Sequence, residues 1–575
     1  MIKLTRFLRP FAAAVSAVLG LVFLQSLAEL ALPTLMSDII NTGVMRGDTA
    51  YIWRVGGRML LVAAGSAVCA IAVSYLAARI AAGFGRILRA RVFTRAESFS
   101  LHEFDKIGTS TMITRTTNDI TQVQMVMVMI LRMMVMAPMM AIGGTIMAVS
   151  KDAHLSLILL IAVPFLAAVI TLLASRTIPL FTLMQSKLDR LNRVLREGLT
   201  GIRVIRAFDR VEYEKRRFEE ANRDLTETAI RVNRILAVLF PVLMLVMNFT
   251  SISIVWFGGI RIDNGQMKLG DMMAFIQYAM QIMFSLVMVS MMFVMIPRAE
   301  ASATRINEVL ETAPEINDPT EPKRVASQRG LVEFEDVTFS YPGAEQPALN
   351  HISFRAEPGQ VTAIIGGTGS GKSTLISLIP RFYDVDSGRV LVDGVDVREM
   401  TQDDLRARIG FVPQKAVLFT GTIADNIRYG KETATDEEVR RAAEIAQATE
   451  FISGMKDGFA SEISQGGTNV SGGQKQRLSI ARALVRRPEI YVFDDSFSAL
   501  DFRTDARLRA ALRKETADAT VIIVTQRVST VMDADQIIVL DDGEIAGIGR
   551  HKDLLKTCPV YREIVSSQLS EEELA

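Results

Sequence analysis

GGTGSGKST, at Gly366 to Thr374, is the stretch from which the architecture of the C-terminal half can be worked out. The β-forming run VTAII, residues 361–365, precedes it, and a helical pattern begins at Thr374. The pattern GxxxxGK[ST] between a strand and a helix is typical of a P-loop, whose backbone N–H groups close around phosphate oxygens. The N-terminus of the helix adds its dipole. The sequence therefore predicts a nucleotide-phosphate site at the edge of a parallel sheet.

Candidate ligands in this loop follow from their chemistry. Lys372 supplies a cation to the phosphates, and Ser373 offers a hydroxyl to Mg²⁺. The residues expected to bind the nucleotide are Gly366, Gly367, Thr368, Gly369, Ser370, Gly371, Lys372, Ser373 and Thr374.

A second stretch, IYVFDDSFSALD at Ile490 to Asp501, complements the loop. Four β-formers end in Asp494 and Asp495, which is how a buried parallel strand delivers carboxylates to the edge of a sheet. Asp494 is therefore expected to bind Mg²⁺, directly or through water. Together the two stretches predict ATP and Mg²⁺ as ligands.

Composition divides the chain in two. Its 575 residues are too many for a single core, 49% are apolar and 22% are charged, so two or more domains are expected. Apolar blocks repeat before about residue 297, whereas strands alternate with helices from about residue 331, an α/β pattern. The net charge of only +1 argues against a nucleic-acid partner.

Six apolar blocks are long enough, at about 20 residues each, to cross a bilayer as helices. They lie at about 11–36, 59–80, 123–150, 155–175, 235–258 and 272–296. Arginines and lysines concentrate after the second and fourth blocks and before the fifth. This distribution predicts that these connections and both termini lie on the cytoplasmic side of the cell membrane. The predicted fold class is an all-α six-helix membrane domain followed by an α/β P-loop domain.

The two inner connections are long and helical in pattern, and each is interrupted. The interruptions lie at 100–120 and 199–210, where a short amphipathic element would suit docking on another domain; a solvated loop is the alternative. The expected domains are a membrane domain at 1–312, a polar linker at 313–330 and a nucleotide-binding domain at 331–575.

The stretch VSGGQKQRLSIARAL, Val470 to Leu484, resembles the signature loop and helix of ATP-binding cassette (ABC) transporters. The order of motifs matches that family over 331–560, and six spans with two long inner hairpins are similar to its exporter branch. The resemblance implies an ATP-driven half-transporter whose interruptions are coupling helices. It also implies a dimer in which the signature of one chain meets the nucleotide on the P-loop of the other.

The resemblance assigns further residues to the nucleotide site. Tyr341 in FSYPG matches the aromatic residue that stacks on adenine. Gln414 in FVPQ matches the residue that links Mg²⁺ and the attacking water to the membrane domain, and SALD at Ser498 to Asp501 matches a loop that crosses the dimer interface. The signature residues expected to meet the γ-phosphate are Ser471, Gly472, Gly473 and Gln474.

Within the catalytic site, two positions depart from the family pattern. Asp495 stands where the family has its catalytic Glu, and its side chain is shorter by about 1.5 Å; a misplacement of about 1 Å can slow a reaction roughly 10²-fold. Gln526 stands where the family has its switch His, and an amide carries no positive charge and moves no proton. With Gln414, these are the candidate catalytic residues of a site predicted to bind ATP and hydrolyse it weakly; the alternative is that Asp495 is an adequate base.

A weakened P-loop site beside an intact signature implies a heterodimer, because two copies of this chain would hold two impaired sites. A second, non-identical half-transporter would supply the competent P-loop. The chain resembles the degenerate-site subunit of bacterial heterodimeric multidrug exporters, which implies export of hydrophobic or amphipathic small molecules. A lipid flippase of the same fold and a nucleotide-gated regulatory or channel-like subunit are the alternatives.

Polar residues within the spans mark a candidate substrate cavity, since a charge there costs about 2.5–3.5 kcal/mol on insertion scales. Gln25 and Glu29 share a face of the first span, and Gln277 and Gln281 share a face of the sixth. Arg132 lies in the third, where an ion pair with Glu29 is an alternative role. Methionine suits an adaptable apolar pocket, although ordinary packing is equally consistent. The methionines at helical spacing in the third and sixth spans are Met125, Met129, Met133, Met136, Met140, Met273, Met280, Met288, Met291 and Met295.

Overall fold

The computed structural model describes residues 1–325 and 329–568, and of Leu239, Met291, Phe293 and Val294 it describes the backbone alone. Part of the expected linker (326–328), the end of the expected nucleotide-binding domain (569–575) and the Met291 side chain therefore lie outside the described residues. Two compact units make up the chain. The first comprises Met1–Glu97 and Thr109–Thr312, and the second comprises Ser98–Gly108 and Ala313–Ala575.

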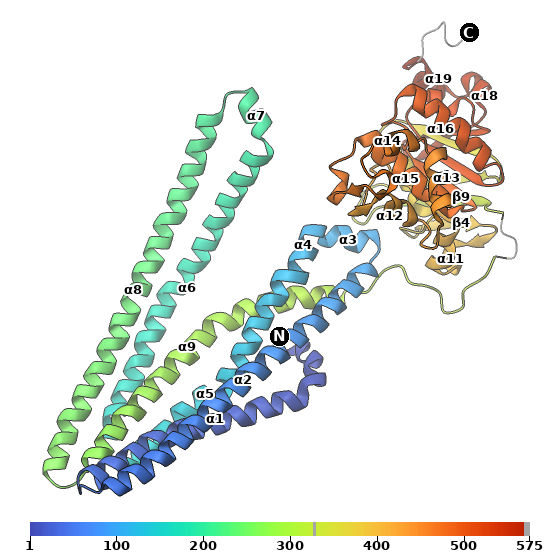
Figure 1. The fold of residues 1–575 in the computed structure, drawn as a ribbon. Coiled ribbons are helices and arrows are strands. Elements are labelled where there is room, and N and C mark those ends of the chain that lie inside the picture. Colours follow the sequence, from blue (N-terminus) through green and yellow to red (C-terminus); the bar gives the residue numbers. More distant parts are fainter. Residues whose placement is uncertain (326–328, 569–575) are drawn as a thin grey trace. The chain divides into compact units, whose positions relative to one another are not determined.

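Six long helices form the first unit (Figure 1). Within the described residues, six helical segments are long and apolar enough to cross a bilayer, which confirms the six predicted spans. The long helices are α1 (Ala12–Asp38), α2 (Thr49–Glu97), α5 (Ile120–Lys151), α6 (Ser156–Thr200), α8 (Val211–Asp263) and α9 (Leu269–Glu311). Shorter elements are η1 (Ile2–Phe11), η2 (Ile39–Val44), α4 (Thr109–Thr114), η3 (Arg115–Asp119) and α7 (Ile202–Ala207).

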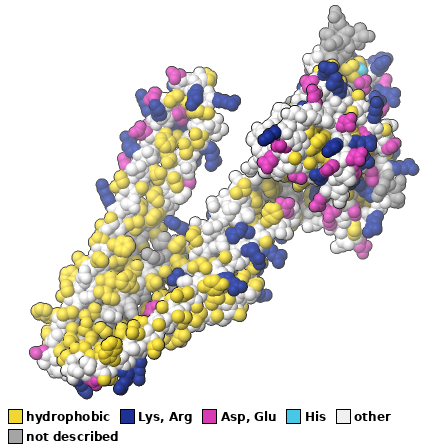
Figure 2. Space-filling view, in the orientation of Figure 1, with side chains coloured by type: hydrophobic (Ala, Val, Ile, Leu, Met, Phe, Trp, Pro, Cys, Tyr) yellow, Lys and Arg dark blue, Asp and Glu magenta, His cyan; other side chains and the backbone are white. Residues whose placement is uncertain are grey.

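Apolar side chains cover much of the outside of this unit, as Figure 2 shows. Ile161 and Trp256, for example, are exposed to 72% and 69%. A soluble domain would bury such residues, whereas lipid solvates them. The exposed apolar surface is therefore the expected outside of a bundle within a bilayer.

Packing arranges the first unit as a bundle of α1, α2, α5 and α9 and a long hairpin of α6 and α8 (Figure 1). Tyr278 of α9 is fully buried, and its hydroxyl donates to the Leu30 carbonyl oxygen at 2.8 Å and lies 2.6 Å from Thr34 Oγ1 of α1. The hairpin meets α9 through an apolar cluster that includes Leu166 and Met283. These contacts place polar residues of α1 opposite those of α9.

The second unit contains an antiparallel sheet and a larger, mostly parallel one. The antiparallel sheet has the order β2 (Leu349–Ala356), β1 (Val332–Phe339), β4 (Ser387–Val392) and β5 (Val395–Asp396). The larger sheet has the order β12 (Glu544–Gly549), β11 (Gln536–Asp541), β3 (Val361–Gly366), β10 (Thr520–Val524), β9 (Ile490–Asp494) and β6 (Ile409–Val412), with β12 the antiparallel edge strand. A short pair joins β7 (Gly421–Thr422) and β8 (Glu462–Ile463).

Alternating side chains of β9 and β10 explain how this larger sheet is covered. Tyr491 and Phe493 face a core formed with α12 (Ile423–Arg428), α13 (Asp436–Ile445), α15 (Gly472–Arg486) and α16 (Phe502–Glu515). Ile490 and Val492 face a core formed with α10 (Lys372–Leu378) and the antiparallel sheet. Both faces are buried, so the strands read as continuous apolar runs. This layering confirms the predicted α/β domain.

The helices of the second unit are α3 (Leu101–Ile107), α10 (Lys372–Leu378), α11 (Gln402–Ala407), α12 (Ile423–Arg428), α13 (Asp436–Ile445), α14 (Thr449–Ser453), α15 (Gly472–Arg486), α16 (Phe502–Glu515), α17 (Val528–Val531), α18 (His551–Thr557) and α19 (Pro559–Ser566). Single turns lie at η4 (Val397–Glu399), η5 (Gly458–Ala460) and η6 (Gln465–Gly467).

Candidate nucleotide site and membrane cavity

The candidate nucleotide site lies at the carboxyl ends of four neighbouring parallel strands. β3 leads into the P-loop, and β10 leads to Gln526. β9 ends in Asp494, and Gln414 follows β6 by two residues. Val524 of β10 is in register with Asp494 of β9 and with Ile364 of β3. Parallel pairing therefore brings four separate stretches of sequence to one edge, where ligands of open α/β sheets bind.

Glycines permit the unusual backbone of the P-loop. Gly369 and Gly371 have φ angles of 87° and 92°, in a region that L side chains rarely occupy. A Cβ atom at Gly371 would lie 2.8 Å from the carbonyl oxygen of Ala348, whereas one at Gly367 would meet nothing within 4 Å. The loop is thus packed closely on one side and open on the other, as a loop that surrounds phosphate must be.

Lys372 lies across this loop. Its Nζ donates to the carbonyl oxygen of Gly366 at 2.9 Å and to that of Gly367. Burial lowers the pKa of Lys372, and the charges of Asp494 and Asp495 oppose that shift. Because an anionic phosphate is a stronger partner for an ammonium group than a carbonyl, Lys372 can exchange these bonds for phosphate contacts.

Ser373 and Asp494 form the candidate metal pair. Ser373 Oγ donates to Asp494 Oδ1 at 3.1 Å. Burial raises the pKa of Asp494; the Ser373 hydrogen bond opposes this shift and the charge of Asp495 adds to it. Hydroxyl and carboxylate oxygens are ligands that Mg²⁺ prefers, and a cation would offset the buried charge. The residues present therefore fit a magnesium ion.

Asp495 is held beside this pair. Its φ angle is 43°, a left-handed conformation that Asp tolerates better than most residues. Its N–H donates to the carbonyl oxygen of Val524 at 2.9 Å, and Gln414 Nε2 makes a long hydrogen bond of 3.5 Å to Asp495 Oδ2. The structure thus places Gln414, Asp494 and Asp495 together.

Gln526 and Tyr341 lie at the margin of the site. The side chain of Gln526 is exposed. The Tyr341 hydroxyl lies 3.0 Å from Thr374 Oγ1 at the start of α10, and its ring meets those of Phe339 and Tyr383 edge-on. Tyr341 is 40% exposed, so part of its ring surface is open to a base.

The signature residues open helix α15 through a capping box. Gln474 N donates to Ser471 Oγ at 3.3 Å, and Ser471 N donates to Gln474 Oε1 at 2.8 Å. A Cβ atom at Gly473 would lie 3.0 Å from the carbonyl oxygen of Ala499, whereas one at Gly472 would meet no atom of the described residues within 4 Å. Gly472 therefore faces open space at a helix N-terminus, which suits an anion.

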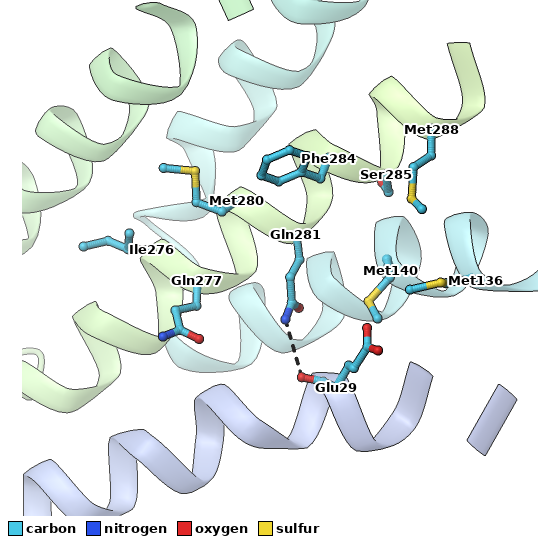
Figure 3. Close-up of a pocket in the computed structure, with 10 residues that line it drawn as sticks. All are labelled: Glu29, Met136, Met140, Ile276, Gln277, Met280, Gln281, Phe284, Ser285 and Met288. Carbon is cyan, nitrogen blue, oxygen red and sulfur yellow. Dashed lines mark hydrogen bonds between the residues drawn. The ribbon is translucent and has the colours of Figure 1, made fainter. Parts of the chain in front are cut away.

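A cavity of about 340 Å³ lies between α1, α5 and α9 of the first unit (Figure 3). Three of the predicted substrate residues, Glu29, Gln277 and Gln281, line it together with methionines and an aromatic ring. Its lining residues are Glu29, Met136, Met140, Ile276, Gln277, Met280, Gln281, Phe284, Ser285 and Met288. A mainly apolar wall with a few polar groups is the usual composition of a small-molecule site.

The polar groups of this cavity are only partly satisfied. Gln25 Nε2 donates to Glu29 Oε1 at 2.8 Å. Gln281 Nε2 donates to the Glu29 carbonyl oxygen at 3.4 Å, and its buried Oε1 has no hydrogen-bond partner among the described residues. Arg132 lines a neighbouring hollow that shares two methionines with the cavity. The described residues show no ion pair between Glu29 and Arg132, so the pairing considered from the sequence is not formed.

Sequence reasoning missed one cluster, in which α3 meets the start of the linker. Glu103 is 5% exposed; its carboxylate accepts from Ser100 N at 2.6 Å and from Glu315 N at 2.8 Å. His102 Nδ1 lies 2.9 Å from Glu315 Oε1. The pattern S-x-x-E at Ser100 predicts the start of the helix, but no local pattern predicts the hydrogen bond between Glu103 and Glu315.

Comparison with known proteins identifies the family. The model for the ABC transporter transmembrane region matches residues 15–286, and the model for the ABC transporter domain matches residues 349–498. An uncharacterised ABC transporter ATP-binding protein of Mycobacterium tuberculosis is 46% identical over 569 residues, which cover 98% of this chain and 97% of the relative. This chain belongs to the ABC transporter family, as an exporter half-transporter.

Other relatives of the half-transporter carry names that specify a cargo. A fatty acid ABC transporter ATP-binding/permease protein of Mycobacterium bovis is 35% identical, over 83% of this chain and 75% of the relative. An ATP-dependent lipid A-core flippase of Chromobacterium violaceum is 30% identical, over 95% of this chain and 93% of the relative. The solved structure of a bacterial Atm1-family ABC exporter with ATP bound has a TM-score of 0.81 and 27% identity, and the match covers 97% of this chain and 99% of that one. The half-transporter therefore has an ATP-binding domain and the Atm1-family exporter fold.

Proposed function

We propose that this half-transporter is one subunit of a heterodimeric exporter, and that its own P-loop site binds ATP and hydrolyses it weakly. The observation that carries the proposal is the pair Asp495 and Gln526, in place of a Glu and a His, beside a complete P-loop and signature. The residues that hold the nucleotide are those of the P-loop with Tyr341.

Asp495 has little freedom to compensate for its short side chain. Its N–H is bonded to Val524 on the neighbouring strand, so the main chain is held on the sheet. The missing methylene shortens its reach by about 1.5 Å, which is enough to slow general-base catalysis severely. Gln526 can donate a hydrogen bond to a phosphate but supplies no charge.

The residues that would hold Mg²⁺ lie at the same edge of the sheet as Asp495. Mg²⁺, when bound, would neutralise part of the phosphate charge. Ser373 and Asp494 would hold it, and Gln414 would connect it to Asp495, to which Gln414 is already hydrogen-bonded. These residues bind and orient the nucleotide whether or not hydrolysis follows, which suits a site that retains ATP.

The intact signature argues for a different partner subunit. Gly472 stands open at the N-terminus of α15, available to the nucleotide on another chain. If that chain carries a Glu and a His, the site it shares with Ser471 to Gln474 is competent. The heterodimer then has one active site and one site that keeps ATP between the domains.

The cavity of Figure 3 supports a hydrophobic or amphipathic cargo of the multidrug type. Methionines adapt to different apolar shapes, and the unpartnered Gln281 Oε1 can accept a hydrogen bond from a ligand. A lipid flippase is the second candidate, favoured by the exposed Arg132 beside the cavity and by relatives with lipid cargoes.

We place the complex in the cell (plasma or inner) membrane with both termini on the cytoplasmic side, as the arginine distribution indicates.

Two measurements test this function. The ATPase activity of the purified chain is compared with that of the chain co-purified with the product of a neighbouring transporter gene; we expect low activity alone and high activity together. High activity of the chain alone would rule out the weak-site proposal. Export of a fluorescent amphipathic dye, compared with transbilayer movement of a labelled phospholipid in the same vesicles, separates the multidrug and flippase functions.

A further inference from the structure

Gln526 lies in a short segment that follows strand β10 of the larger sheet. Thr525 is still tied to this sheet, because its N–H donates to the carbonyl oxygen of Ile364 at 3.2 Å. Helix α17 begins at Val528, so residues 526–528 form a switch segment between the strand and the helix. The contacts of this segment determine where the side chain of Gln526 starts.

A side chain 42 residues further along the chain is bonded to the switch segment. Gln568 Nε2 donates to the Gln526 carbonyl oxygen at 2.7 Å, and Gln568 Oε1 accepts from the Val528 N–H at 2.9 Å. A glutamine side chain carries both the donor and the acceptor of a peptide group. It pairs here with a carbonyl and an N–H two residues apart, as a neighbouring parallel strand would. Gln568 therefore supplies two backbone hydrogen bonds to the segment that follows the strand.

The core beneath α19 fixes the position from which Gln568 reaches. Tyr561 and Val565 of α19 are fully buried in a cluster with Val528 and Val531 of α17. Gln568 follows Tyr561 by seven residues and Val565 by three, and its N–H donates to the Val565 carbonyl oxygen at 3.0 Å. Residues at this spacing share one face of a helix, so Gln568 continues the face of α19 that packs against α17.

A second contact joins the switch segment to the stretch expected to cross the dimer interface. Arg527 Nη2 donates to the carbonyl oxygen of Ser498, at 2.7 Å. This contact runs through a long side chain with many rotamers, whereas Gln568 bonds to the backbone atoms of the segment. Of these two contacts, that of Gln568 is therefore the one that fixes the backbone from which the Gln526 side chain extends.

Loss of the Gln568 side chain should displace the switch segment without unfolding the domain. Gln568 is exposed, so water can replace both of its hydrogen bonds. The core between α17 and α19 is formed by apolar side chains, which such a change leaves in place. The expected consequence is a loss of position at Gln526 rather than a loss of fold.

We propose that Gln568 is a positioning residue of the nucleotide site, which holds the switch segment so that the Gln526 amide can donate to the γ-phosphate. The inference rests on the proposed role of Gln526 and adds a residue beyond α19 to the same site. ADP lacks the γ-phosphate, so a residue that acts through Gln526 affects the affinity for ATP and leaves the affinity for ADP unchanged. Because it concerns binding, the inference is independent of how fast the site hydrolyses ATP.

The test measures the half-saturating concentrations of ATP and of ADP, each with Mg²⁺, for the full-length chain by displacement of a fluorescent nucleotide. Gln568→Ala should raise that of ATP about fivefold, since a hydrogen bond to a charged group is weakened, and leave that of ADP unchanged. Ser567→Ala is the matched control in the same turn, because Ser567 Oγ donates to the Ile564 carbonyl oxygen of α19; it should change neither value.

Gln568→Glu provides a second variant that keeps one of the two bonds. Its carboxylate still accepts from the Val528 N–H, but an oxygen now stands against the Gln526 carbonyl oxygen in place of the donor. The affinity for ATP should therefore fall as it does in Gln568→Ala. An ATP affinity equal to that of the unchanged chain would show that the bond to Gln526 holds nothing in place.

A double-mutant cycle decides whether Gln568 acts through Gln526. Gln526→Ala should itself weaken the binding of ATP and not that of ADP, and the addition of Gln568→Ala should cause no further change. An equal loss on Gln568→Ala with and without the Gln526 side chain would show that Gln568 acts elsewhere.

Three further results would overturn the inference, and they separate it from the proposed function. Equal weakening of ATP and ADP binding by Gln568→Ala indicates an effect on the fold of the domain. If Gln526→Ala weakens ATP binding and Gln568→Ala does not, the positioning role alone is wrong. If Gln526→Ala leaves ATP binding unchanged, the proposed contact of Gln526 with the γ-phosphate is wrong as well.

Discussion

Asp495 is constrained by its backbone as much as by its length. Its φ angle of 43° and its hydrogen bond to Val524 fix where the side chain starts, and Gln414 is the side chain with which its carboxylate bonds. Adjacent to it, Asp494 is buried with a raised pKa. Asp494 is thus placed to bind a metal, whereas Asp495 is the shorter side chain on which the weak-site proposal rests, and each leads to a separate prediction.

Asp495→Glu should raise ATP hydrolysis at this chain's site by about 10- to 100-fold, because the longer side chain recovers the lost reach. The measurement is ATP turnover of the chain alone. Asp495→Asn, which keeps the length and removes the base, is the control and should give no increase. If Asp495→Glu also gives none, the absence of a charged residue at Gln526 is the limitation.

Asp494 makes stability depend on pH. Because its folded-state pKa is raised above the ordinary 3.8, the folded chain binds this proton more tightly than the unfolded chain, and stability falls as pH rises from 3.8 through the raised value. Asp494→Asn should therefore raise the unfolding temperature of the nucleotide-free protein at pH 7 and abolish its further increase with Mg²⁺ and ATP. Asp501→Ala should lower the unfolding temperature, since backbone and side-chain hydrogen bonding to Thr504 lowers the pKa of Asp501. A lower unfolding temperature for Asp494→Asn would contradict the assignment.

Helix α3 illustrates how an element is held in place. Its capping box and the Glu103 to Glu315 hydrogen bond join it to the start of the linker, within the second unit. A buried carboxylate that accepts several N–H and O–H donors cannot be removed without leaving those donors unpaired. We infer that α3 responds to the nucleotide-binding domain through this contact.

Glu103→Ala should lower the free energy of unfolding by roughly 1–3 kcal/mol, because it leaves buried donors unpaired and removes a capping partner. It should also reduce cargo-stimulated ATPase activity of the heterodimer more than its affinity for ATP. Denaturant unfolding and ATPase assays with and without cargo measure the two effects. Glu97→Ala, at an exposed acid near the end of α2, is the control; equal effects of the two variants would exclude a coupling role for Glu103.

Across the assembled transporter, the two motifs of this chain should serve different nucleotide sites. In the proposed heterodimer, its P-loop would form the weak site, and its signature would complete the site of the partner. Gly472 can carry a side chain without a clash inside this chain, so a change there tests the interface rather than the fold.

Gly472→Glu should therefore lower the ATPase activity of the heterodimer by about 100-fold or more, because a carboxylate would repel the γ-phosphate bound by the partner. Lys372→Ala, which removes the cation of this chain's own P-loop, should leave most of that activity. Both variants are measured in the co-purified heterodimer, with trapped nucleotide as a second readout. If Lys372→Ala costs as much as Gly472→Glu, the two sites are equally active and the asymmetry is wrong.

Much of this architecture could be predicted because its signals are local. Runs of about 20 apolar residues predicted the six spans. The P-loop, the signature and the strand before Asp494 predicted the ABC fold. The meeting of Gln414 with Asp495 was expected only through the family resemblance. The contacts of α6 and α8 with α9 had no such signal, since residues that face lipid and residues that face a neighbouring helix are equally apolar.

Residue order was sufficient for the class of protein, the nucleotide and the two departures from the family pattern on which the weak-site proposal rests, because each depends on a short motif with its own chemistry. Packing was required to learn that, within the described residues, Glu29 forms no ion pair with Arg132, and that Glu103 accepts a hydrogen bond from the N–H of Glu315. Those relations join residues far apart in the chain. They depend on where long helices cross, and no local pattern encodes that geometry.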